Sequence, residues 1–185
     1  MINIYDNNRK VIGKRILKKY NNFNQYPNKN WIKVYHGTKY NYLISIIKNG
    51  LKKPGEIFDN NEKVKPRKGH INFGKTVNNV KNWAKAIFVS PSIFYSSCRS
   101  YSQRIESNNK TWRIVVEVKI KPNSFESYNS TIPKYHFLLG EPKKIEYRIE
   151  NKNDIKVYSV LFVEDNYISR AKSYREGSIY NFISD

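Results

Sequence analysis

The pair His36-Gly37 ends the apolar run WIKVYHG (31–37). β-Branched and aromatic residues in such a run are typical of a buried strand. A histidine at the end of a strand can donate or accept a hydrogen bond, and a glycine beside it leaves its peptide groups accessible to a ligand. The pair therefore indicates a binding cleft. The same residues also fit a structural histidine next to a turn glycine, and the local pattern favours that interpretation.

A second cluster, SIFYSSCRSY (92–101), combines hydroxyl groups with aromatic rings and follows the apolar run AIFVS (86–90). We expect a short buried strand over 86–90 and a helix over 92–105. Hydroxyls and a ring close together could hold a planar, amide-bearing ligand by stacking and hydrogen bonds. An ordinary amphipathic helix explains the same pattern. The candidates for a binding role are Ser96, Ser97, Ser100 and Tyr101, and those for burial are Ile93, Phe94 and Tyr101.

The third candidate is Glu146, a carboxylate within the otherwise apolar run IEYRIE (145–150). Charged groups avoid burial unless they are paired or functional. A buried carboxylate can stabilise a positive charge that develops in a transition state. The alternative is a solvent-facing residue of an edge strand that pairs with Arg148.

Strands and one clear helix must bring these clusters together. Apolar residues at 43, 46, 47 and 51 have the spacing of a helix face, with Thr38 as the expected cap and Gly50 at the C-terminal end. The run 112–120 alternates as a half-buried strand does, whereas 124–142 is expected to be a loop. Two further runs, 145–150 and 155–163, are joined by the turn NKND and favour an antiparallel hairpin.

The 185 residues are enough for one domain with a hydrophobic core, and 15% aromatic residues indicate a folded chain despite a net charge of +19. The single cysteine excludes a disulfide framework and favours a reducing compartment. No secretory or membrane-spanning run is expected. We expect a single α+β domain of mostly antiparallel β-sheets. Residues 1–30 form a basic N-terminal extension with a short amphipathic helix over 11–17, and residues 31–185 form the body.

The clusters and their order resemble the catalytic domain of ADP-ribosyltransferases. VYHGT is followed by a basic loop, then AIFVSPSIFYSSCRSY, a strand and IEYRI. The resemblance is to the poly(ADP-ribose) polymerase-like, diphtheria-toxin-type branch, whose signature is His, Tyr and Glu on separate strands. It runs from about Trp31 to Val163. It implies an ADP-ribosyltransferase-like fold over residues 31–185 and the use of NAD as substrate, with no metal.

Matching this family residue by residue implies that His36, Tyr101 and Glu146 are catalytic. His36 matches the histidine that bonds a ribose hydroxyl of NAD, and Gly37 matches the glycine whose backbone holds the nicotinamide carboxamide. Tyr101, or Tyr95 in its place, matches the ring that stacks on nicotinamide. Glu146 matches the glutamate that stabilises the oxocarbenium-like state. The implied NAD-binding set is His36, Gly37, Thr38, Tyr95, Ser97 and Tyr101.

The sequence departs from the family pattern at three positions. Phe88 stands where the family triad has tyrosine, and Cys98 stands where a serine binds nicotinamide, a place that Ser97 or Ser100 could take. Lys144, two residues before Glu146, differs from the Gln or Glu of toxins with defined acceptors. The acceptor is therefore not specified.

A second resemblance is to the RNA 2′-phosphotransferases, which share the fold and consume NAD. It rests on RKGHIN (67–72), but an extra residue and Asn72 spoil the match, so that Arg67 and His70 are either ligand contacts or, as the mismatch favours, loop residues. His136 lies in the region that contacts the acceptor in the family. It is therefore either a contact of the acceptor or an ordinary loop or edge residue.

The resemblance thus implies an NAD-dependent ADP-ribosyltransferase that releases nicotinamide. We expect mono-transfer, because no accessory domain supports elongation. The expected partners are NAD and a macromolecular acceptor, either an acidic protein or a nucleic acid, and no membrane. We expect a monomer in the cytoplasm or nucleus, with a secreted effector as the other option. The alternatives are an RNA 2′-phosphotransferase-like enzyme, an inactive module that binds NAD or ADP-ribose, and a nucleic-acid-binding domain, since the charge attracts phosphates.

Overall fold

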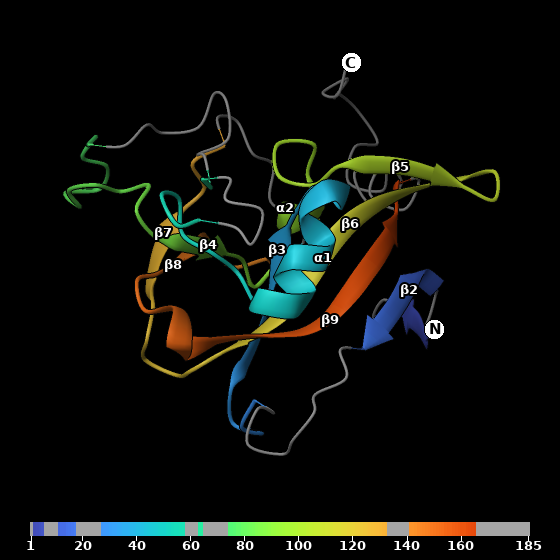
Figure 1. The fold of residues 1–185 in the computed structure, drawn as a ribbon, viewed down its shortest axis with the longest axis horizontal. Helices are drawn as coiled ribbons and strands as arrows, with labels where there is room; N and C mark the ends of the chain where they lie inside the picture. Colours follow the sequence, from blue (N-terminus) through green and yellow to red (C-terminus); the bar gives the residue numbers. More distant parts are fainter. Residues whose placement is uncertain are drawn as a thin grey trace.

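The computed structural model describes residues 2–5, 11–17, 27–57, 63–64, 74–132 and 141–165 (Figure 1). Within these residues the chain forms two antiparallel sheets and two short α-helices, which confirms the expected strand-rich α+β class. In this part of the chain, no helix has the length and apolar character needed to cross a lipid bilayer.

The larger sheet has the order β1-β2-β9-β6-β3, and β5 also pairs with β6. The run 112–120, which the alternation of apolar residues predicts to be a strand, lies in β6, and β6 pairs with β3, β5 and β9. All strand pairs of this sheet are antiparallel. These strands are β1 (Ile2–Tyr5), β2 (Val11–Leu17), β3 (Ile32–Gly37), β5 (Arg104–Ser107), β6 (Lys110–Ile120) and β9 (Ile155–Glu164).

The smaller sheet has the order β4-β8-β7, so that β8 is its middle strand. Its strands are β4 (Ile87–Val89), β7 (Glu126–Asn129) and β8 (Lys144–Ile149). Tyr35 of β3 and Ser90, just after β4, exchange backbone hydrogen bonds of 2.8 and 2.9 Å. This bridge fixes the end of β4 beside the free edge of β3.

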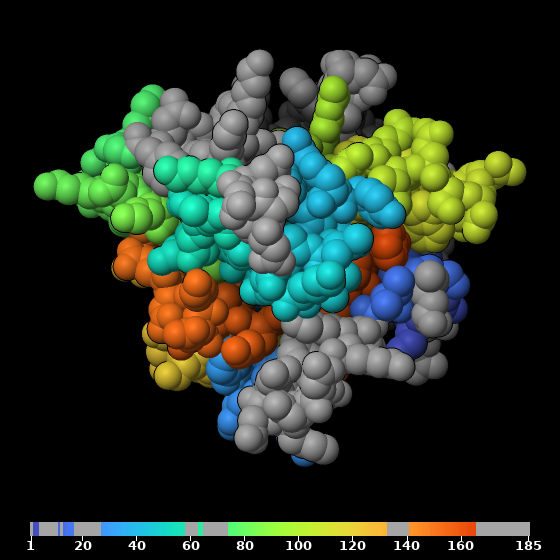
Figure 2. Space-filling model, in the orientation of Figure 1, coloured from blue at the N-terminus to red at the C-terminus, as the bar shows by residue number. Residues whose placement is uncertain are grey.

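The main core lies between α1 (Tyr40–Asn49), one face of the larger sheet and the apolar face of the smaller sheet. α1 contributes Leu43 and Ile46, which lie with Val116 and Val118 of β6, as the helical spacing predicts. The helix begins after Lys39 rather than at a Thr38 cap, and it ends at Gly50, whose φ is +80°. In Figure 2 the atoms of α1 and of the residues after it cover the centre of one face of the molecule.

The second face of the larger sheet carries a smaller core, where Val115 and Leu161 contact α2 (Ile93–Ser97). The N-terminal strands are fastened to this sheet by a buried ion pair. Arg15 Nη2 of β2 lies 2.8 Å from Glu117 Oε2 of β6, and Glu117 is 2% exposed. The same carboxylate oxygen accepts a hydrogen bond of 2.9 Å from Ser159 of β9.

The helix that we expected over 11–17 is wrong, because these residues form β2. The strand pairs with β9 from Gly13 to Leu17. A Cβ at Gly13 would lie 2.3 Å from the Phe162 carbonyl oxygen, so the two backbones approach closely. Pairing with the edge of β9 therefore overrides the weak helical spacing of the apolar residues.

Three other expectations about local structure are also corrected. The helix expected over 92–105 ends at Ser97, where Ser and Cys side chains bond the carbonyl of Phe94 instead of extending the helix. The segment 124–142, expected to be a loop, contains β7. The hairpin expected over 145–163 is absent, because the 3₁₀ helix η2 (Lys152–Asp154) sends β8 and β9 into different sheets.

Candidate active site

Glu146 lies in the middle of the smaller sheet and is 3% exposed. On β8 it faces Tyr128 of β7 across the ladder. The alternative of a solvent-facing edge residue paired with Arg148 is therefore wrong. Arg148 instead bonds Glu150 at 2.5 Å and donates from Nε to the Trp83 carbonyl oxygen at 3.2 Å.

The Glu146 carboxylate is surrounded by hydroxyl donors and one peptide group. Its Oε1 accepts from Tyr101 Oη at 3.0 Å, from Thr131 N at 3.0 Å and from Thr131 Oγ1 at 2.5 Å. The Tyr95 hydroxyl also donates to Oε1. Within the described ranges no Lys, Arg or His side chain forms an ion pair with Glu146. We call Tyr95, Tyr101, Ser130 and Thr131 the hydroxyl cage.

Tyr95 comes from α2, and Tyr101 comes from the turn that follows it. Because α2 ends at Ser97, Tyr101 lies in this turn and not in the helix. Backbone bonds from Tyr101 and Ser102 to the Cys98 carbonyl close this turn. The two rings lie 5.2 Å apart and their hydroxyl oxygens 3.1 Å apart. Burial, and then the charge of Glu146, raise the pKa of both tyrosines. Both therefore remain protonated donors around neutral pH.

His36 points to the smaller sheet, where its Nδ1 lies 2.8 Å from the Phe88 carbonyl oxygen. A carbonyl oxygen only accepts, so Nδ1 carries the proton and Nε2 keeps a lone pair. Burial lowers the pKa of His36, and the bond to Phe88 opposes this in part. At neutral pH the imidazole is therefore uncharged and can accept a hydrogen bond at Nε2.

Gly37 is the closest backbone contact between β3 and the tyrosine turn. A Cβ at this position would lie 2.0 Å from the Ser96 carbonyl oxygen and 2.8 Å from Tyr101 Cβ, so only glycine fits. Tyr35 bonds Ser90 along the edge opposite β6. Backbone groups alternate between the two edges of an antiparallel strand, so the N–H and C=O of Gly37 face the same edge as those of Tyr35.

The predicted residues thus form a chain of contacts from β3 to β8. Gly37 lies against Tyr101, and Tyr101 bonds Glu146, so the contacts run from β3 through the turn after α2 to β8. His36 precedes Gly37 on the same strand and is held by the first residues of the smaller sheet. Among the described residues, His36 is not one of the hydrogen-bond partners of Glu146.

The other predicted binding residues have mainly local partners. The N–H of Thr38 donates to the Ile114 carbonyl at 3.2 Å, and Thr38 is buried at the end of β3. The Ser97 hydroxyl donates to the Phe94 carbonyl at 3.0 Å in its own helix. Its only proton is therefore already used, which limits Ser97 to accepting a hydrogen bond from a ligand.

Phe88 lies on the same face of the smaller sheet as Glu146, because it pairs with Arg148, two residues further along β8. Its ring is 5.2 Å from that of Trp83, which is fully buried. Trp83 also meets the edge of Tyr128 at 4.5 Å. Phe88 therefore contributes a ring but no hydroxyl to the face of the smaller sheet that carries Glu146.

Ser130 and Thr131 are site residues that the sequence did not reveal. They follow β7 in a segment that has no motif and was expected to be a loop. The one available signal is a short polar run, Ser-Tyr-Asn-Ser-Thr, that follows Glu126. Arg67, His70 and His136 lie outside the described residues.

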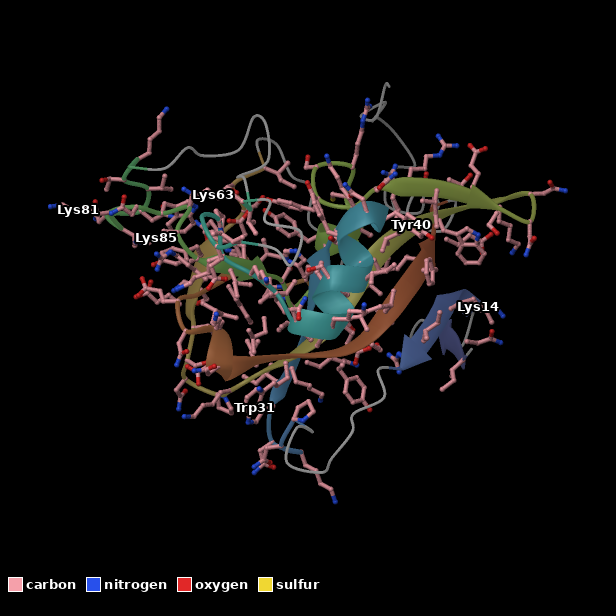
Figure 3. The ribbon with its side chains drawn as sticks, viewed as in Figure 1. Lys14, Trp31, Tyr40, Lys63, Lys81 and Lys85 are labelled. Atoms are coloured by element: carbon pink, nitrogen blue, oxygen red, sulfur yellow. The ribbon has the colours of Figure 1, made fainter. Side chains whose placement is uncertain are left out.

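Basic side chains lie at widely separated places around the molecule. In Figure 3, Lys81 and Lys14 are at opposite sides of the view, with Lys63 and Lys85 on the side of Lys81. These four lysines are therefore not gathered into one patch.

A scan against protein-family models and a search of curated proteins both found no match for the chain.

Proposed function

We propose that the chain is an enzyme that breaks the bond between nicotinamide and ribose in NAD and passes the sugar to an acceptor. Within this class, the site is best explained as that of an ADP-ribosyltransferase, with a catalytic domain of that fold over residues 31–185. We expect mono-transfer to a protein or nucleic acid and release of nicotinamide. The strand-rich α+β architecture with antiparallel sheets is consistent with this assignment.

The observation that carries the proposal is the buried Glu146 carboxylate, which is bonded by hydroxyls and linked through Tyr101 to Gly37. Breaking a glycosidic bond of this kind passes through an oxocarbenium-like state. A preorganised carboxylate in a site with little water stabilises such a cation. Since the tyrosines stay neutral and no basic group of the described chain pairs with Glu146, its negative charge remains available for this purpose.

The residues near Glu146 can bind the two groups that the broken bond of NAD joins, nicotinamide and ribose. The outward peptide groups of Gly37 can bond a carboxamide, and the Tyr101 ring beside them can orient nicotinamide. The Nε2 lone pair of His36 can accept a proton from a ribose hydroxyl in a hydrogen bond. Thr38, Tyr95 and Ser97 border the same region and remain proposed contacts of NAD.

The test is nicotinamide release from NAD that is labelled in the nicotinamide ring. We expect release by the wild-type chain and a loss of about 10²–10³-fold in Glu146→Gln, since the removed charge acts mainly on the transition state. Glu106→Gln is the matched control because Glu106 lies on β5 and its side chain is 78% exposed. Equal rates for all three proteins would remove Glu146 from the mechanism.

A second candidate is a module that binds NAD or ADP-ribose without cleaving it. The observations in its favour are the Ser97 proton, which is used within α2, and the Phe88 ring, which has no hydroxyl. NAD that binds to the wild-type chain in calorimetry but yields no nicotinamide would favour this candidate.

A further inference from the structure

The two oxygens of Glu146 are in different environments. The hydrogen bonds from Tyr95, Tyr101 and both donors of Thr131 all end on Oε1. In the part of the chain that the structure describes, no hydrogen bond reaches Oε2. Each tyrosine has one hydroxyl proton, and both protons are directed to the same oxygen.

We propose that Thr131 is a positioning residue that holds Glu146 by Oε1 and thereby keeps Oε2 for the substrate; this inference rests on the proposed function. Thr131 binds Oε1 with its peptide N–H and its hydroxyl together, so one residue fixes the oxygen from two directions. A carboxylate held in this way turns little about its last bond. Oε2 then faces the ribose hydroxyl and the developing cation in one orientation.

Ser130 also orients one of the tyrosines that bond Glu146. Its Oγ lies 3.1 Å from the Tyr95 hydroxyl and accepts the N–H of Ile132 at 3.1 Å. When Ser130 donates to Tyr95, the Tyr95 proton is free to point to Glu146, so the two bonds form a relay that ends on Oε1. The residues after β7 therefore orient both the carboxylate and one of its tyrosine donors.

A purely structural role would not require a carboxylate at this position. Buried charge without a counter-ion is costly, and neutral donors compensate it only in part. A cage that stabilises one oxygen and leaves the other unbonded fits a group that must meet a ligand. The cage therefore serves the proposed mechanism in addition to the stability that its bonds give the fold.

The kinetic test compares Thr131→Val, which removes the hydroxyl at nearly equal volume, with Thr131→Ser, which restores it. In nicotinamide release, we expect Thr131→Val to lower kcat by about 10–100-fold with KM changed less than about 2-fold, because only the orientation of Glu146 is lost. Thr131→Ser should return kcat to within about 3-fold of wild type. Ser127→Ala, on β7 shortly before Thr131 in the chain and opposite Tyr147, is the control. If Thr131→Val behaves like Ser127→Ala, the positioning role is refuted.

A second measurement separates this inference from the proposed function because it needs no NAD. The melting temperature is measured for Thr131→Val in the wild-type background and in a Glu146→Ala background. We expect a fall of about 2–4 °C in the first and less than about 1 °C in the second, since the hydroxyl then has no partner. Equal falls in melting temperature in both backgrounds would refute the proposal that Thr131 holds Glu146. If the wild-type chain releases no nicotinamide, the proposed function fails, and this cycle alone decides whether Thr131 holds Glu146.

Discussion

Gly37→Ala offers a test of the way in which β3, α2 and Tyr101 are joined. The added Cβ would lie 2.0 Å from the Ser96 carbonyl oxygen, whereas real Cβ atoms stay beyond 3.0 Å from such neighbours. The backbone at Ser96 or at Gly37 must therefore shift by about 1 Å, because the obstacle is a peptide group and not a flexible side chain. The same shift displaces Tyr101, whose Cβ would be 2.8 Å from the new methyl group.

The cost can be estimated from these distances. Overpacking of this kind destabilises a fold by about 2–3 kcal/mol, which corresponds to a fall in Tm of about 4–12 °C for a chain of this length. A displacement of about 1 Å at a catalytic ring lowers the rate by about 10²-fold. Thermal unfolding and nicotinamide release measure the two effects on the same protein.

Gly50→Ala is the matched control for this substitution. Gly50 has φ +80° and ψ −175°, a conformation essentially confined to glycine, and no atom lies within 4 Å of the place that a methyl group would take, so the change adds only backbone strain of about 1–3 kcal/mol. We expect a fall in Tm of about 2–12 °C from this strain and an unchanged rate of nicotinamide release, so the rate separates the two variants. If Gly37→Ala and Gly50→Ala have the same effect on Tm and on the rate of nicotinamide release, β3 does not closely approach the turn that carries Tyr101.

Three further perturbations follow from the buried charges and from the shifted pKa values. Because the pKa of His36 is lowered in the folded state, its contribution to stability is present above the unfolded pKa and is lost as pH falls below about 6.5; His36→Asn should lose less Tm than wild type between pH 7 and pH 5. The pKa of Tyr35 is raised to about 12, and the pKa values of Tyr95 and Tyr101 are raised further. The stability that these protonated hydroxyls contribute is present below about pH 10 and should be lost as the pH rises. In an ultraviolet titration, the three tyrosines should ionise only when the chain unfolds. Arg15→Met leaves the Glu117 carboxylate without its cation and should lower stability by about 3 kcal/mol in urea unfolding, whereas an unchanged midpoint would show that the N-terminal strands are not fastened by this pair.

The strands and residue types of the site could be predicted from the sequence because they depend on local patterns. β3, β6, β8 and β9 follow runs of β-branched residues, and His36-Gly37 and Glu146 fall on them as expected. The partners of these strands could not be predicted, because pairing depends on distant edges. The short turn after β8 suggests a hairpin, yet η2 leads the chain into the other sheet.

The cage around Glu146 also lies beyond a local pattern. Thr131 becomes a site residue only because β7 pairs with β8 and ends beside Glu146, which is a consequence of register. The turn that carries Tyr101 arises where a serine-rich helix stops early, and helix periodicity alone would have extended it. Both features come from tertiary pairing and from hydrogen bonds between side chains and the backbone.

The most direct test of the catalytic account is the single-turnover rate of nicotinamide release, with enzyme in excess over NAD, for the wild-type chain and for Glu146→Gln. Equal Tm values would first show that both proteins are folded. The account predicts release by the wild-type chain and a rate about 10²–10³-fold lower for the variant. A folded wild-type chain that releases no nicotinamide, or a variant within about 3-fold of it, would contradict the account.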